Sequence, residues 1–178
     1  MSEMMQVIES QEVDPANAEV LEHETGSQYL SFIVGDEVFA VDILSVQEIR
    51  AWEHPTYLPN SPRYVKGVLN LRGTIVPVID LRVRFDFKRH EYSETTVIII
   101  LKNSAGGRDR LMGCVVDGVS DVFNIDEEKI RELPGNTSNI DNYFTEGVAT
   151  VNDVAVTLLN LRNLLSLDLI EHPFTGRG

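Results

Sequence analysis

The sequence predicts an all-β fold built from small barrels or a sandwich, with only short helices. Short apolar runs alternate with turns about every ten residues, which is typical of such folds. Segments with helical periodicity are few and brief. A hydrophobic pattern also occurs twice, in the same order, along the chain. Together these observations favour small barrels or a sandwich over a parallel α/β sheet. Barrels would also remove free strand edges, which invite aggregation.

Four hairpins account for most of the predicted strands. Each joins two β-prone runs across a segment that contains Gly, Asn or Asp, the residues that tolerate the backbone of tight turns. The paired runs are Tyr29–Val34 with Val38–Ile43, Gly67–Leu71 with Ile75–Ile79, Thr96–Lys102 with Leu111–Val116, and Gly147–Val151 with Val154–Leu159.

The remaining segments are expected to be loops and short helices. Trp52–Arg63 contains three prolines, which interrupt sheet ladders and restrict the residue before them. Helical turns are expected at Leu44–Ile49, Asp126–Lys129 and Asn160–Leu167, and loops or linkers at Trp52–Arg63, Phe85–Thr95 and Leu133–Tyr143.

The repeated pattern indicates a duplicated unit. Gly67–Arg82 matches the sequence 80 residues further on without gaps, so that Asp80-Leu81-Arg82 corresponds to Asn160-Leu161-Arg162. A second match, at an offset of 73, places Val46 against Val119 and Ile49 against Val122. The two ordered matches predict a domain over residues 28–168, with subdomains at about 28–92 and 93–168. Residues 169–178 are expected to form a C-terminal tail.

Charge is concentrated at the N-terminus. Residues 1–27 contain seven acids and no Lys or Arg, so they contribute −7 to the net charge of −13. This segment is expected to be a disordered, solvated tail, with an autoinhibitory or partner-binding role as the alternative. The acidic total argues against binding to nucleic acid or an anionic membrane.

The remaining composition indicates a cytoplasmic protein. The first residues have no basic or apolar signal region, and no apolar run is long enough to cross a bilayer. Direct membrane insertion is therefore not expected. The lone Cys114 cannot form an internal disulfide and is expected to pack in the core.

Catalytic and metal-binding motifs are not apparent. His23, His54, His90 and His172 are scattered and have no second His or Cys at metal-ligand spacing. Phosphate-loop, dinucleotide and nucleophile-elbow motifs are absent from the sequence. The prediction is a non-enzymatic binding module without cofactor or metal; an enzyme would need a site assembled from scattered residues.

Arg72 is the first candidate binding residue, because it lies at a hairpin tip beside Gly73. It is either an ordinary solvated turn arginine or a guanidinium presented to a partner carboxylate, or to Glu48 as a bidentate pair. The segment containing Val46, Glu48 and Ile49 is either a helical turn with both apolar residues packed inward or the rim of a groove. Val119 and Val122 occupy the equivalent place in the second copy.

A groove between these two segments would suit a helix. A separate basic patch is predicted at Arg82, Arg84, Lys88 and Arg89, as a solvated face or as a partner for the acidic tail.

Three segments resemble the CheW chemotaxis coupling proteins: Val41–Arg50, Tyr64–Arg82 and Gly113–Val122. The likeness extends in a consistent order over about residues 28–168. It implies two SH3-like, five-stranded β-barrels joined by a hydrophobic interface. It also implies a scaffold that links methyl-accepting chemoreceptors to a CheA-type histidine kinase at membrane-associated arrays, with possible ring or array assembly.

The resemblance also implies site residues. The cytoplasmic tip of the receptor is expected to dock between the barrels, where Val46, Glu48, Arg72 and Val122 match family positions. Ile49 and Val119 complete the predicted receptor-binding set. The predicted kinase-binding residues are Lys66, Gly67, Val68 and Ile75. The alternative is a generic SH3-like adaptor for linear peptides outside chemotaxis, although such grooves are usually lined by aromatic residues and only 7% of this chain is aromatic.

Overall fold

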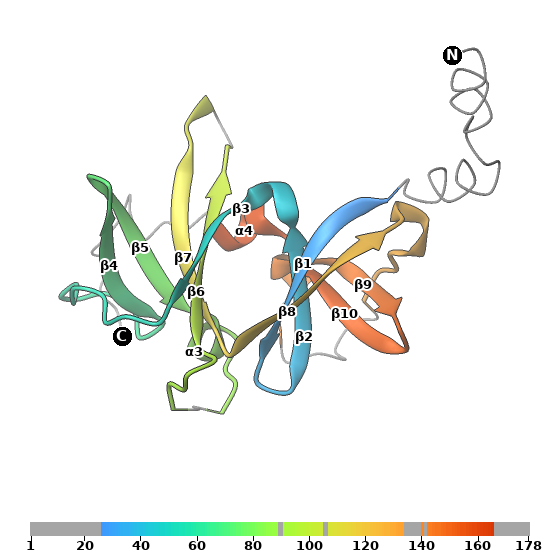
Figure 1. The fold of residues 1–178 in the computed structure, drawn as a ribbon, viewed down its shortest axis with the longest axis horizontal. Helices are drawn as coiled ribbons and strands as arrows, with labels where there is room; N and C mark the ends of the chain where they lie inside the picture. Colours follow the sequence, from blue (N-terminus) through green and yellow to red (C-terminus); the bar gives the residue numbers. More distant parts are fainter. Residues whose placement is uncertain (1–25, 89–90, 105–106, 134–139, 141, 166–178) are drawn as a thin grey trace, which may run out of the picture.

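The computed structural model describes residues 26–88, 91–104, 107–133, 140 and 142–165. Within them, ten strands form two five-stranded sheets connected by short helices (Figure 1). This confirms the predicted all-β fold with two small subdomains. Most of the predicted acidic tail, residues 1–25, and the predicted tail 169–178 lie outside the described residues.

Each sheet forms one barrel. Barrel A has the strand order β8-β1-β2-β10-β9, and barrel B has the order β3-β6-β7-β5-β4. Barrel A contains β1 (Ser27–Val34), β2 (Glu37–Asp42), β8 (Gly118–Ile125), β9 (Thr145–Val151) and β10 (Val154–Leu159). Barrel B contains β3 (Val46–Ala51), β4 (Val65–Leu71), β5 (Thr74–Asp80), β6 (Val97–Asn103) and β7 (Arg110–Val116). The four predicted hairpins are confirmed as β1–β2, β4–β5, β6–β7 and β9–β10.

The barrels do not follow the predicted subdomain boundary near residue 92. Barrel A combines the first hairpin of the first half with three strands of the second half, and barrel B has the reverse composition. The two copies therefore exchange their first hairpins. Each exchanged hairpin joins its sheet through a parallel pair, β2 with β10 and β7 with β5. Local turn chemistry selects the hairpins, but only tertiary packing selects the strand that each hairpin edge meets.

The duplication is visible in the strand registers. Leu69 pairs with Val76 in barrel B, and Ala149 pairs with Val156 in barrel A, at the predicted offset of 80. The parallel pairs correspond as well, because Val78 lies opposite Gly113 and Leu158 lies opposite Ala40. Equivalent positions in the two copies thus occupy equivalent places in two barrels.

Short helices occupy the connections. They are η1 (Ile43–Ser45), α3 (Leu81–Arg84), η3 (Glu127–Lys129), η4 (Asn142–Phe144) and α4 (Leu161–Leu165). The predicted helices at 126–129 and after Asn160 are confirmed. The helical prediction for Leu44–Ile49 is wrong beyond Ser45, because pairing with β6 draws Val46–Ala51 into the extended strand β3.

Each barrel is closed by an isolated β-bridge. Thr56 and Val68 exchange two backbone hydrogen bonds of 2.9 Å in barrel B, and Arg131 and Val148 do the same in barrel A at 2.9 and 2.8 Å. A Cβ atom on Gly67 would lie 2.1 Å from the Thr56 carbonyl oxygen. A Cβ atom on the equivalent Gly147 would lie 2.7 Å from the Arg131 oxygen. Glycine is therefore required where the two backbones meet.

The hydrophobic core has three parts. Each barrel has its own interior, represented by Val156 and Leu158 in barrel A and by Val76 and Val78 in barrel B. The largest cluster includes side chains from both barrels. It includes Phe85, whose ring lies 5.6 Å from that of Phe39, so the predicted polar linker Phe85–Thr95 is wrong at its first residue. Burial against both the barrel interior and the interface explains fully buried runs such as Ile98–Leu101.

Candidate functional site

The tip of the β4–β5 hairpin is a tight, well-defined turn. Arg72 and Gly73 both have positive φ, at 50° and 86°, as a two-residue type I′ turn requires. The side-chain oxygen of Asn70 accepts a hydrogen bond from the Gly73 N–H at 2.8 Å. These features fix the backbone from which the Arg72 side chain projects.

Glu48 on β3 anchors the Arg72 side chain. Nη2 of Arg72 lies 3.1 Å from Oε2 of Glu48, while Nη1 of Arg50 lies 2.9 Å from Oε1. Of the alternatives for Arg72, the contact with Glu48 is confirmed, but its bidentate geometry is wrong because Arg50 occupies the second oxygen. The Arg72 side chain is 83% exposed and that of Glu48 only 22%. The carboxylate is thus held low on the surface, and the guanidinium stands above it.

The two arginines also stabilise the charged form of Glu48. The hydrogen bond from Arg50 is the largest influence and lowers the pKa of the Glu48 carboxyl. Partial burial opposes this effect, and the charge of Arg72 adds to it. The carboxylate therefore remains ionised at neutral pH and holds both guanidinium groups.

The predicted apolar receptor-binding residues lie on the edge strands of the two sheets. Val46 on β3 and Val119 on β8 are partly buried against the shared core. Ile49 and Val122 are 45% and 50% exposed, so the alternative in which Ile49 packs inward is wrong. β8 pairs with β1 in barrel A, whereas β3 pairs with β6 in barrel B. The set is therefore divided between the barrels, and within it Glu48 and Arg72 form an ion pair.

The predicted kinase-binding residues lie on the β4–β5 hairpin. Val68 lies opposite Pro77 and Asn70 lies opposite Ile75, so these side chains share the outer face of the sheet. Ile75 is 60% exposed. Lys66 is half-buried beside a bulge in β4. Gly67 is buried at the seam of barrel B, where the close approach of the Thr56 backbone explains why this residue is a glycine.

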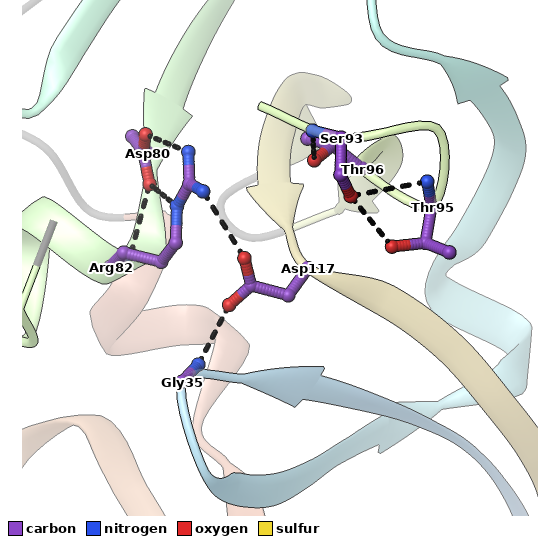
Figure 2. Close-up of polar contacts among 7 residues, drawn as sticks. All are labelled: Gly35, Asp80, Arg82, Ser93, Thr95, Thr96 and Asp117. Carbon is purple, nitrogen blue, oxygen red and sulfur yellow. Dashed lines mark hydrogen bonds and ion pairs between the residues drawn. The ribbon is translucent and has the colours of Figure 1, made fainter. Parts of the chain in front are cut away.

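A buried ion cluster was missed by the sequence analysis (Figure 2). Arg82, predicted in a solvated basic patch, has a side chain only 3% exposed. Its Nη2 and Nε lie 2.8 and 3.0 Å from the two carboxylate oxygens of Asp80, and its Nη1 lies 3.1 Å from Oδ1 of Asp117. The signal available in the sequence was a difference between the two copies of the repeat, because the charged Asp80 corresponds to the uncharged Asn160.

Arg84 also departs from the predicted patch. Its guanidinium carbon lies 4.6 Å from the Tyr64 ring centre and 4.4 Å from that of Phe144. Lys88 is exposed, and Arg89 lies outside the described residues. Two of the four residues of the predicted basic patch, Arg82 and Arg84, thus make structural contacts.

The described residues contain few chemically reactive groups. They include no cluster of three or more His, Cys, Asp or Glu side chains suited to a metal ion. Burial raises the pKa of the Cys114 thiol to about 12, so its nucleophilic thiolate is suppressed. Among the same residues, no helix combines the length and apolar character that a membrane span needs.

Comparison with known proteins places this geometry in a family. The family model of the CheW-like domain matches residues 28–168. The chemotaxis protein CheW of Klebsiella aerogenes is 40% identical over 141 residues, which cover 79% of this chain and 82% of that protein. CheW of Helicobacter pylori is 30% identical over 167 residues, covering 94% and 98% of the two chains. The crystal structure of the scaffolding protein TtCheW from Thermoanaerobacter tengcongensis aligns with a TM-score of 0.71 and 33% identity, covering 81% of this chain and 90% of that one.

Proposed function

Because this chain belongs to the CheW-like domain family, we propose that it is a non-enzymatic adaptor that couples methyl-accepting chemoreceptors to a CheA-type histidine kinase. It acts in the cytoplasm and is recruited to membrane-associated receptor arrays. The observation that carries the proposal is the exposed guanidinium of Arg72, held on a rigid tip by Glu48.

The receptor surface comprises Val46, Glu48, Ile49, Arg72, Val119 and Val122. One nitrogen of Arg72 bonds to Glu48, which leaves the other guanidinium donors for a carboxylate of the receptor. Ile49, on the strand that holds Glu48, and Val122, on β8 of barrel A, supply exposed apolar side chains. Exposed apolar side chains together with a fixed cation suit the amphipathic helical hairpin at a receptor tip.

The kinase surface comprises Lys66, Gly67, Val68 and Ile75 on the flank of the same hairpin. Ile75 contributes an exposed apolar side chain, and Lys66 contributes a positive charge. The tip of one hairpin thus serves the receptor while its outer face serves the kinase. A change in receptor contacts reaches the kinase if those contacts differ in free energy between signalling states.

Calorimetric titration with two separate partners tests this function. The partners are a cytoplasmic receptor hairpin fragment and the regulatory domain of the kinase. Arg72→Ala should weaken receptor binding roughly tenfold, the effect of losing one important interface side chain, and leave kinase binding unchanged. Ile75→Asp should weaken kinase binding and leave receptor binding unchanged.

Asn152→Ala provides the matched control, because Asn152 occupies the equivalent hairpin tip of the second copy. It should alter neither affinity. Failure of the unmodified chain to bind either partner would overturn the proposed function. Binding to linear peptides in place of both partners would favour the generic adaptor instead.

A further inference from the structure

The ion cluster around Arg82 crosses from one barrel to the other. Arg82 belongs to α3, which follows β5 of barrel B, and Asp80 at the end of β5 caps that helix by accepting the Arg82 N–H at 3.0 Å. Asp117 lies where the chain passes from β7 of barrel B to β8 of barrel A. The contact between Arg82 and Asp117 therefore lies at the joint between the barrels (Figure 2).

Asp117 also forms two hydrogen bonds with residues of barrel A. Its Oδ2 accepts the N–H of Gly35, in the β1–β2 turn, at 2.7 Å. Its own N–H donates to the carbonyl oxygen of Ile33 at 2.9 Å. One carboxylate oxygen of Asp117 thus accepts from Arg82 of barrel B, and the other accepts from Gly35 of barrel A. Asp117 cannot shift without breaking a charged contact on one side of the joint.

In the part of the chain that the structure describes, the second copy shows no such ion cluster at its equivalent place. Asp80 and Arg82 correspond to Asn160 and Arg162, and Arg162 is exposed. At the offset of 73, Asp117 corresponds to Leu44, which is also exposed. A pocket of about 380 Å³ lies there instead, lined by Asn160, Arg162 and residues of the β2–β3 connection. Among the described residues, an ion pair between the barrels is thus seen at the first place and not at the second.

Two aromatic side chains connect the cluster to β3. The guanidinium carbon of Arg82 lies 5.0 Å from the Tyr92 ring centre, and that ring stacks on Trp52 at 3.9 Å between ring centres. Trp52 directly follows β3, which contains Glu48. The Tyr92 ring thus lies between Trp52, which follows the receptor-surface strand, and the Arg82 side chain.

We propose that Arg82 is a positioning residue, whose contact with Asp117 sets the angle between the two barrels. The receptor surface is divided between β3 in barrel B and β8 in barrel A, so this angle determines how Arg72 and Val122 face a common partner. The inference rests on the proposed function for its consequence in signalling, while the barrel angle itself is measurable without any partner.

Asp117→Asn is the decisive variant, because it keeps the shape of the side chain. Asp117 accepts a hydrogen bond at each oxygen, whereas an asparagine presents one oxygen and one NH₂ group. Whichever way the amide turns, a donor faces either Arg82 or Gly35, and one link across the joint is lost. Arg82→Lys is the second variant, since lysine keeps the charge but not the planar fork. Arg162→Lys, at the exposed equivalent position, is the matched control.

The barrel angle is read from spin labels on the full chain. Labels at Thr74→Cys in barrel B and Thr150→Cys in barrel A both replace exposed residues, and the buried Cys114 does not compete for the reagent. Asp117→Asn and Arg82→Lys should broaden and shift the distribution of distances between the labels. Arg162→Lys should leave it unchanged. Unchanged distributions in both joint variants, with the fold intact by circular dichroism, would overturn the proposal.

The signalling consequence has its own readout. Each joint variant should bind the kinase domain as the unmodified chain does, while receptor-dependent control of kinase activity falls roughly tenfold, within the range of coupling between sites. Normal control in a variant with an altered distance distribution would refute the role in positioning. If the unmodified chain bound no receptor or kinase, the proposed function would fail, and the spin-label result would still decide whether Arg82 holds the joint.

Discussion

Arg72 and Glu48 form an ion pair across the seam of barrel B. The two residues are 24 positions apart in sequence, and they come from β3 and from the end of β4, the two outer strands of the sheet order. Barrel closure through the Thr56–Val68 bridge brings these outer strands together. The ion pair between Arg72 and Glu48 therefore depends on closure of the barrel. The Glu48 carboxylate also forms an ion pair with Arg50.

The shared carboxylate leads to a prediction about the pKa of Glu48. Because the Arg50 hydrogen bond lowers this pKa more than Arg72 does, Arg50→Met should raise it more than Arg72→Met. Carbon-detected NMR titration of the Glu48 carboxyl measures both shifts. Because folding lowers the pKa of the Glu48 carboxyl, its ion pairs stabilise the folded protein at pH values above the pKa that this carboxyl has in the unfolded chain. That stabilisation is lost as the pH falls through the pKa of Glu48 in the folded protein. A larger shift from Arg72→Met would contradict the assignment.

The closure glycine leads to a prediction about stability. Gly67→Ala should lower the free energy of unfolding by about 3 kcal/mol, because its Cβ atom would overlap the Thr56 carbonyl at positive φ. Gly73→Ala is the control: it also has positive φ but has open space around it, so a loss of about 1 kcal/mol is expected. Urea denaturation measures both. Equal losses would mean that close approach at the seam is unimportant.

Gly147→Ala extends this prediction to the second copy. Its Cβ atom would lie 2.6 Å from the Ile130 side chain and 2.7 Å from the Arg131 oxygen. We expect a loss of stability comparable to that of Gly67→Ala, again about 3 kcal/mol. Only Gly67 lies on the proposed kinase surface, so a kinase-binding defect seen equally in both variants would reflect folding rather than contact.

Cys114 should be inert in the folded protein. Its pKa of about 12 and its full burial deny a thiol reagent both the thiolate and access. At pH 8, labelling should proceed no faster than unfolding, and addition of urea should restore ordinary thiol reactivity. Rapid labelling of native protein at rates independent of urea would contradict the burial of β7.

The hairpin exchange predicts how fragments behave. Because each barrel needs strands from both halves, the fragments 28–92 and 93–168 should each lack the dispersed amide NMR spectrum of residues 28–168. Mixing the two fragments should recover that spectrum if assembly follows the native topology. A fully dispersed spectrum from either fragment alone would show that a half can form its own barrel.

The sequence alone determined the parts whose physics is local. Hairpins followed from β-prone runs and turn residues, and the repeat placed equivalent strands correctly at offsets of 80 and 73. Contact between Arg72 and Glu48 was one of the alternatives that the hairpin tip left open, and the structure shows that contact.

Only the tertiary structure decided which strands share a barrel and where Arg82 lies. Parallel pairing of β2 with β10 depends on contacts between residues more than a hundred positions apart, and no turn motif encodes that choice. Likewise, a basic residue in sequence is expected to be solvated unless partners are known to surround it. Asp80 is only two residues away in sequence, but Asp117 becomes the second partner only when the joint between the barrels forms. Burial between these two carboxylates makes Arg82 a structural contact and not a surface charge.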